Sequence, residues 1–103
     1  MLCLGISANA HQAQCKVPGT DGGVSVSVNY YDSENGKITI DYGNETSVPV
    51  NITVTINYSI NGGTNPIKHT IYAGAYSGGS KEFSGQPKKA SVSSISVSGQ
   101  KCN

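Results

Sequence analysis

The chain has 103 residues, a net charge of +1 at neutral pH, and charged side chains at only 13% of its positions. All seven cationic side chains are lysines, so the chain lacks the basic face and the arginine contacts that nucleic-acid recognition uses. These features exclude nucleic-acid binding, and no run of about 18 apolar residues indicates a membrane span. The length fits a single domain.

Residues 1–10 join a short apolar stretch to the small-residue site Ala8-Asn9-Ala10. Such an ending is typical of a secretory signal peptide, although this segment is short and lacks a lysine-rich leader. Two interpretations therefore stay open: a truncated signal peptide, or an N-terminal arm of the mature protein. In either case residues 11–103 form the domain. We expect it to be secreted, extracellular or at a cell surface, with the periplasm as an alternative.

The cysteines support export. Removal of residues 1–10 would remove Cys3 and leave Cys15 and Cys102, which predicts one disulfide joining the two ends of the domain. A bond that closes a loop of about 90 residues stabilises a fold by about 4–5 kcal/mol in the chain-entropy model. If Cys3 is retained, it is available to crosslink neighbouring chains.

Apolar and polar residues alternate with period two along most of the chain, and sustained helical spacing is absent. A short strand is predicted near 15–17, followed by strands over 24–30 and 37–42 that are joined by a hairpin turn at Asn35-Gly36. The clearest run is 48–60, in which every even-numbered residue is apolar. Such alternation gives a strand one buried and one solvent-exposed face, which is typical of an antiparallel sheet.

The rest of the chain predicts three more strands, at 67–72, 81–83 and 90–97. Between them we expect a turn cluster at 61–66 and a flexible stretch at 73–80. The last strand changes phase between Val92 and Ile95, which predicts a β-bulge near Ser93-Ser94.

About seven strands separated by turns every 8–12 residues predict an all-β fold. The expected architecture is a single two-sheet antiparallel sandwich of the immunoglobulin or fibronectin type III kind. A jelly roll is the alternative.

The stretch that begins at Gly43-Asn-Glu-Thr resembles immunoglobulin-like modules of bacterial secreted and surface proteins. The likeness continues through the long alternating strand, the Asn61-Gly-Gly turn and the Ala73-Gly74 loop, and it covers about half of the chain. The core tryptophan of a true immunoglobulin domain is absent. The resemblance implies a sandwich fold, and it assigns no functional residue.

The residues that carry chemistry do not form a recognisable catalytic or metal-binding set. His11 and His69 are the only histidines, and zinc needs three or four clustered ligands. No Gly-x-Ser-x-Gly motif occurs. We interpret His69 as a strand histidine that is either satisfied within the fold or faces the rim, and Asp32 and Glu34 as solvated turn acids. The sequence thus predicts no enzyme, catalytic residue, metal or cofactor.

Tyrosines provide most of the aromatic side chains. Three share a face with core residues and are expected to pack inside: Tyr30, Tyr42 and Tyr58. The other three are freer and form a candidate patch for binding a glycan or a protein: Tyr31, Tyr72 and Tyr76. Three asparagines match the acceptor pattern for N-glycosylation and would be candidate sites in a eukaryotic host: Asn44, Asn51 and Asn57.

These features favour an exported, non-enzymatic structural or interaction domain. One form would be a subunit of an extracellular fibre or surface assembly that joins its neighbours by strand addition. The alternative is a small soluble module that binds a glycan or a protein, or that acts as an inhibitor.

Overall fold

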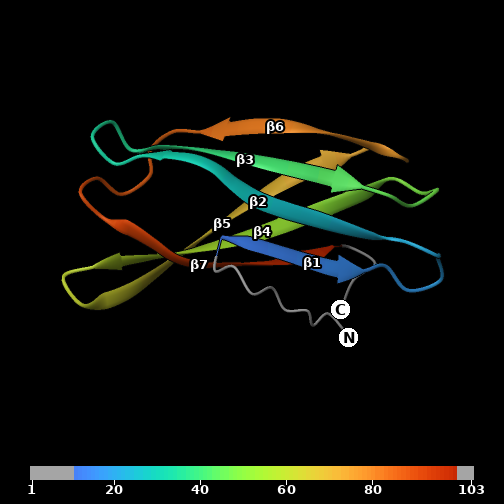
Figure 1. The fold of residues 1–103 in the computed structure, drawn as a ribbon, viewed down its shortest axis with the longest axis horizontal. Helices are drawn as coiled ribbons and strands as arrows, with labels where there is room; N and C mark the ends of the chain where they lie inside the picture. The colour runs from blue at the N-terminus through green and yellow to red at the C-terminus, as the bar shows by residue number, and fades with distance from the viewer. Residues whose placement is uncertain (1–10, 100–103) are drawn as a thin grey trace.

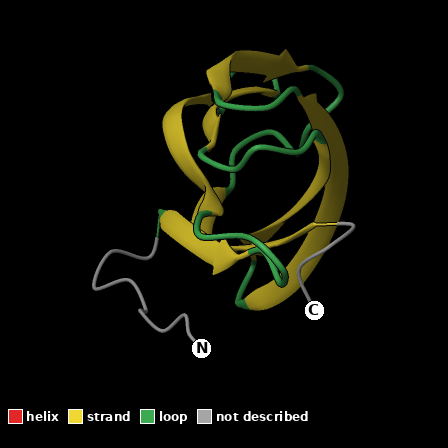
Figure 2. Cartoon of the chain, turned by 90° about the vertical axis from the view of Figure 1, so that its right-hand side faces the viewer, coloured by secondary structure: helices red, strands yellow, loops and turns green. Residues whose placement is uncertain are grey.

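The computed structural model describes residues 11–99, and all regular elements in this range are strands. In chain order they are β1 (Gln12–Lys16), β2 (Gly23–Asp32), β3 (Lys37–Asn44), β4 (Val50–Ile60), β5 (Gly63–Ala73), β6 (Ser77–Phe83) and β7 (Ser91–Gly99). They form two antiparallel sheets that pack face to face (Figures 1 and 2). The predicted all-β sandwich is therefore confirmed. The described residues include no helix that is long and apolar enough to cross a membrane.

The first sheet, sheet A, has the strand order β1-β2-β3-β6, and the second, sheet B, has the order β5-β4-β7. The long alternating run forms β4, the centre of sheet B. Its even-numbered side chains from Val50 to Tyr58 are buried in the core between the sheets, as the pattern predicted, and Ile60 is partly buried. Because β4 pairs along its whole length with the equally long β5, all eleven residues have a ladder partner.

The turn between β4 and β5 is shorter than predicted. Asn61 and Gly62 both have positive φ, at 52° and 84°, which makes a two-residue hairpin whose twist matches the strands. The following residues, up to Pro66, already belong to β5. Proline is tolerated there because β5 lies at a sheet edge.

The flexible stretch predicted at 73–80 is wrong for its second half, since β6 begins at Ser77. Its glycines allow β6 to lie close against β3. A Cβ on Gly78 would stand 2.7 Å from the Tyr42 carbonyl oxygen, and the Tyr42 ring covers the inner side of Gly79. This strand therefore forms because its glycines leave room for Tyr42, and not because it is rich in the β-branched residues that usually favour strands.

Two bulges change the phase of the alternation. The predicted bulge in the last strand is confirmed: Asn57 pairs with Ser94 and Tyr58 with Val92, which leaves Ser93 as the extra residue. A second bulge was not predicted. Val28 pairs with Ile40 and Tyr30 with Thr39, so β2 carries one extra residue at Asn29.

One end of the sandwich is held by the hairpin between β2 and β3. Its turn spans 33–36, so it includes the predicted Asn35-Gly36 pair but is longer than two residues. The loop from 85 to 90 packs against its tip: Gln86 N donates to Gly36 O, and Lys89 N donates to Ser33 O, both at 2.9 Å. Gly36 has φ +68°, and a Cβ there would lie 2.4 Å from the Gln86 carbonyl oxygen. Only glycine fits at this contact.

The sides of the sandwich differ from each other. On one side β1 and β7 run next to each other in the same direction (Figure 1), and His11 Nε2 donates to Val92 O at 3.0 Å. On the other side β6 stands at the edge of sheet A beside β3 (Figure 1), and it contacts sheet B at Phe83, which stacks on His69 of β5.

Candidate functional site

The three tyrosines of the predicted patch are not brought together. Tyr31 pairs with Ile38 near the start of β3, whereas Tyr72 pairs with Asn51 near the opposite end of the sandwich. Tyr76 lies in the connection that follows β5, and its N–H donates to Thr46 O. Tyr72 and Tyr76 are 65% and 72% exposed. The predicted patch therefore reduces to these two side chains.

Tyr31 and Tyr30 exchange the roles predicted for them, and the bulge at Asn29 is the reason. Past the extra residue the alternation is inverted, so Tyr30 is 62% exposed while Tyr31 turns inward. The Tyr31 ring lies 5.2 Å from that of Tyr58, and its hydroxyl donates to Pro87 O. Burial raises the pKa of Tyr31 above its ordinary value.

The three candidate glycosylation asparagines have different environments. Asn51 is exposed on the outer face of β4, and Asn57 is half-buried there and donates to Ser94 Oγ at 3.0 Å. Asn44 is only 1% exposed. Its side-chain amide is enclosed by the fold, so Asn44 is not accessible for glycosylation in the folded chain.

Asn44 instead closes one end of the sandwich. Its Nδ2 donates to three carbonyls, those of Val48 at 2.8 Å, Gly74 at 3.0 Å and Ala73 at 3.2 Å. Its Oδ1 accepts from the Thr46 N–H at 3.0 Å and from the Thr46 hydroxyl at 2.7 Å. One buried amide thereby ties the turn after β3 to the turn after β5.

Gln86 closes the opposite end. Its Oε1 accepts from the Tyr58 hydroxyl at 2.9 Å and from His69 Nε2 at 3.1 Å, so His69 carries its proton on Nε2. The Gln86 Nε2 donates to Ser84 O at 3.0 Å. His69 also stacks on Phe83 with ring centroids 4.0 Å apart, which confirms that this histidine is satisfied within the fold. Burial raises the pKa of Tyr58 well above its ordinary value.

The acids of the β2–β3 hairpin serve the loop itself. Asp32 Oδ1 accepts from the N–H groups of Glu34 and Asn35, and its Oδ2 accepts from Asn35 Nδ2 at 2.8 Å. The Asn35 side chain is the main reason that the pKa of Asp32 is lowered. Within residues 11–99 no group of three or more histidine, cysteine or acidic side chains is placed to hold a metal ion.

Cys15 lies half-buried near the end of β1, on the side of the sandwich where β1 adjoins β7. Its predicted partner, Cys102, lies outside the described residues, as do Cys3 and the segment 1–10. The disulfide thus stays a prediction.

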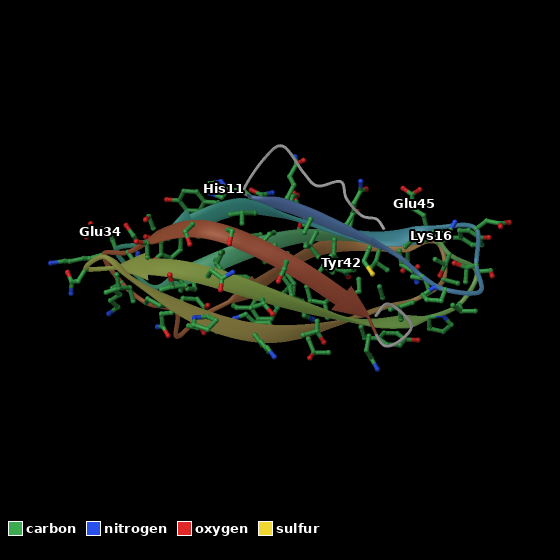
Figure 3. All side chains as sticks on the ribbon, turned by 90° about the horizontal axis from the view of Figure 1, so that it is seen from below. His11, Lys16, Glu34, Tyr42 and Glu45 are labelled. Carbon is green, nitrogen blue, oxygen red and sulfur yellow. The ribbon has the colours of Figure 1, made fainter. Side chains whose placement is uncertain are left out.

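A concave surface lies on the outer face of sheet A. Two adjoining hollows of 390 and 340 Å³ cross β1, β2 and β3, and they share Gln14 and Ser25. We call this surface the trough. One of its ends is at Lys16 and Glu45 (Figure 3), and the hollow at the other end reaches Asp41.

Small side chains form the floor of the trough. Ser25 pairs with Gly43, and Ser27 pairs with Asp41 in the next outward-facing row. Beyond the second row, Asn29 Nδ2 donates to both carboxylate oxygens of Asp41 at 3.1 Å, and the Ser80 hydroxyl donates to Oδ1. Sequence patterns did not predict this cluster, because its members come from three strands and meet only through the register and the bulge.

No protein-family model, curated protein or solved structure matches this chain. The resemblance to immunoglobulin-like modules stays a prediction.

Proposed function

We propose that this chain is an exported, non-enzymatic interaction module that joins a second copy of itself by pairing the two β6 strands. The observation that carries the proposal is the unprotected outer edge of β6. Unpaired N–H and C=O groups at a sheet edge are a template for another strand, and monomeric proteins usually block such edges.

The other three edge strands differ from β6. On β5, Pro66 cannot donate to an added strand. The edges of β1 and β7 adjoin each other. In contrast, β6 has seven residues without a proline or a bulge, six of them exposed.

The charges of β6 favour one register of self-pairing. If two antiparallel copies are centred on Ser80, all seven residues pair, with Lys81 opposite Gly79 and Glu82 opposite Gly78 of the second copy. A shift of one residue in the two-fold centre would put Lys81 directly opposite another Lys81, and like charges there are destabilising. A contact of this kind is isologous and closes at a dimer, so a fibre would need a further contact.

Chemistry-bearing side chains in the described range have structural roles, which supports a non-enzymatic function. His69 is stacked and hydrogen-bonded, and the Asp32 carboxylate caps its own loop. Export is supported by the Ala8-Asn9-Ala10 site and by the spacing of Cys15 and Cys102. The intact mass of the protein from its native host would test cleavage after residue 10 and formation of the disulfide together.

Sedimentation velocity over a concentration series tests the self-pairing. We expect a dimer at high concentration that Ser80→Lys dissociates, because this change places two ammonium groups opposite each other at the two-fold axis. The matched control is Thr70→Lys, at an exposed position on the edge strand β5, which should leave the dimer intact. A wild-type protein that stays monomeric at every concentration contradicts the proposal.

A crosslinking experiment tests the register. With Ser80→Cys we expect an oxidised dimer in which peptide mapping finds residue 80 joined to residue 80. If the dimer forms but Ser80→Lys and Thr70→Lys weaken it equally, the contact lies elsewhere and β6 is not the interface.

A further inference from the structure

We infer that the trough on sheet A is a binding site for a neutral oligosaccharide, with the Tyr30 ring as a stacking platform and the Asp41 carboxylate as the acceptor for sugar hydroxyls. This inference does not depend on the pairing of β6. It rests on the placement of the aromatic ring, the orientation of the carboxylate, the flat floor and the charge of the lining.

The aromatic ring is placed by the bulge at Asn29. A bulge sets two consecutive residues opposite one residue of the partner strand, so Asn29 and Tyr30 both emerge beside Thr39 on the outer face of sheet A. Tyr30 is 62% exposed and stands beyond the Asp41 end of the trough, next to Asn29, whose amide contacts Asp41. Such a ring offers an apolar surface with a polar tip, which suits the apolar face of a sugar ring.

The carboxylate of Asp41 is held in a fixed orientation. Asn29 Nδ2 contacts both of its oxygens at 3.1 Å, and the Ser80 hydroxyl donates to one of them. A carboxylate has about four acceptor positions, and these three hydrogen bonds leave about one of them for a ligand hydroxyl. The neighbours that orient Asp41 thus prepare it for binding without a loss of side-chain freedom.

The floor and wall of the trough suit a flat, hydroxylated ligand. Gly43 has no side chain, and Ser25 and Ser27 beside it are short, so a ring can approach the sheet closely. Gln12 and Gln14 lie along one side of the trough, and each amide can donate and accept. The amides and hydroxyls of the trough suit the neighbouring hydroxyls of a sugar, which also donate and accept hydrogen bonds.

The charge of the trough selects against acidic ligands. Carboxylates in the lining come from Asp21, Asp41 and Glu45, whereas Lys16 is the cation among the described lining residues. A uronic acid or sulfated sugar would meet repulsion there. Along β2 the lining of the trough extends from Gly23 to Ser27, and Tyr30 lies three residues further on. These seven steps span roughly 23 Å at 3.3 Å per residue, which favours a chain over a single sugar.

Calorimetric titration with a panel of neutral hexasaccharides, built from glucose, mannose, xylose or N-acetylglucosamine, tests the site. We expect at least one to bind, with polygalacturonate showing no binding. Tyr30→Ala should weaken the affinity about tenfold, as the loss of an aromatic anchor commonly does. The control is Tyr72→Ala, which removes an equally exposed tyrosine from the outer face of sheet B and should change the affinity less than about twofold.

Three results would overturn the inference. The first is that no neutral hexasaccharide binds the wild-type protein at millimolar concentration. The second is that Tyr30→Ala and Tyr72→Ala reduce the affinity equally. The third is that hexalysine alone binds and Asp41→Asn abolishes that binding, which would identify an acidic surface for basic peptides. Equal urea midpoints of the variants and the wild type exclude unfolding as the cause, and dimerisation that persists in Tyr30→Ala separates this site from the β6 interface.

Discussion

Each end of the sandwich is closed by a buried side-chain amide, but the two amides have different kinds of partner. Asn44, 1% exposed, bonds to three carbonyls and to Thr46, none of which titrates. Gln86, 6% exposed, bonds to the hydroxyl of Tyr58 and the ring of His69. The comparison teaches that two buried amides can differ in their response to pH. The stability of the Asn44 end does not depend on a titrating partner, whereas that of the Gln86 end depends on the protonated Tyr58 hydroxyl.

The largest effect is expected from Asn44→Ala. This change leaves three carbonyls and the Thr46 hydroxyl with fewer partners in a buried place, so the free energy of unfolding should fall by roughly 3–4 kcal/mol. Urea unfolding measures it. Asn65→Ala, at an exposed asparagine on β5, is the control and should cost no more than about 0.5 kcal/mol. Equal losses in the two variants would mean that the Asn44 network does not hold its end of the fold.

A smaller loss is expected from Gln86→Leu. This change leaves the buried Tyr58 hydroxyl without an acceptor, which costs about 1–3 kcal/mol. The double variant Tyr58→Phe/Gln86→Leu should be more stable than the sum of the single changes predicts, because both members of the polar pair are then removed. Strict additivity in urea unfolding would show that the two groups are not coupled.

Alkaline pH should weaken the Gln86 end only. Because burial raises the pKa of Tyr58 in the folded chain, the folded state holds a proton that the unfolded state releases, and this stability is lost as the pH rises above about 10. Urea midpoints from pH 8 to 11 should therefore fall in the wild type and fall less steeply in Tyr58→Phe. Tyr72→Phe, at an exposed ring, should follow the wild type, and a Tyr58→Phe profile that is just as steep would refute this origin.

The smallest effect concerns Asp32 at the same end. Its pKa is lowered chiefly by the Asn35 side chain. The contribution of this carboxylate to the stability of the fold is therefore present above its ordinary pKa of 3.8, and it is lost as the pH falls through the lowered value. In an NMR titration of the carboxyl groups, Asn35→Ala should raise the pKa of Asp32 toward the ordinary value. An unchanged pKa would assign the shift to the backbone N–H donors instead.

Local patterns were sufficient to predict the strands and one bulge. The even-numbered apolar residues of β4 gave its buried face, and the phase change from Val92 to Ile95 gave the bulge at Ser93. The bulge at Asn29 left no such trace, because Tyr30 and Tyr31 are the same residue type and either one could fill the core. The alternation there is consistent with both assignments.

The partners of buried polar groups were beyond local reasoning. Asn44 contacts carbonyls 29 and 30 residues away, and Tyr58 and Gln86 are 28 residues apart. Asn44-Glu-Thr46 matched a glycosylation triplet, but the same spacing lets an asparagine oxygen accept from the backbone two residues on. The burial that decides between the two readings comes from strands that meet only in the folded chain.

The extra residue in β2 has an evolutionary consequence. Deleting the codon for Asn29 would restore an unbroken ladder and leave the neighbouring phenol on the outer face, because Tyr30 and Tyr31 already pair with Thr39 and Ile38. The deletion would instead remove the amide that orients the Asp41 carboxylate. Related sequences that differ by this single indel would share the fold and the exposed ring, and would differ in how that carboxylate is held.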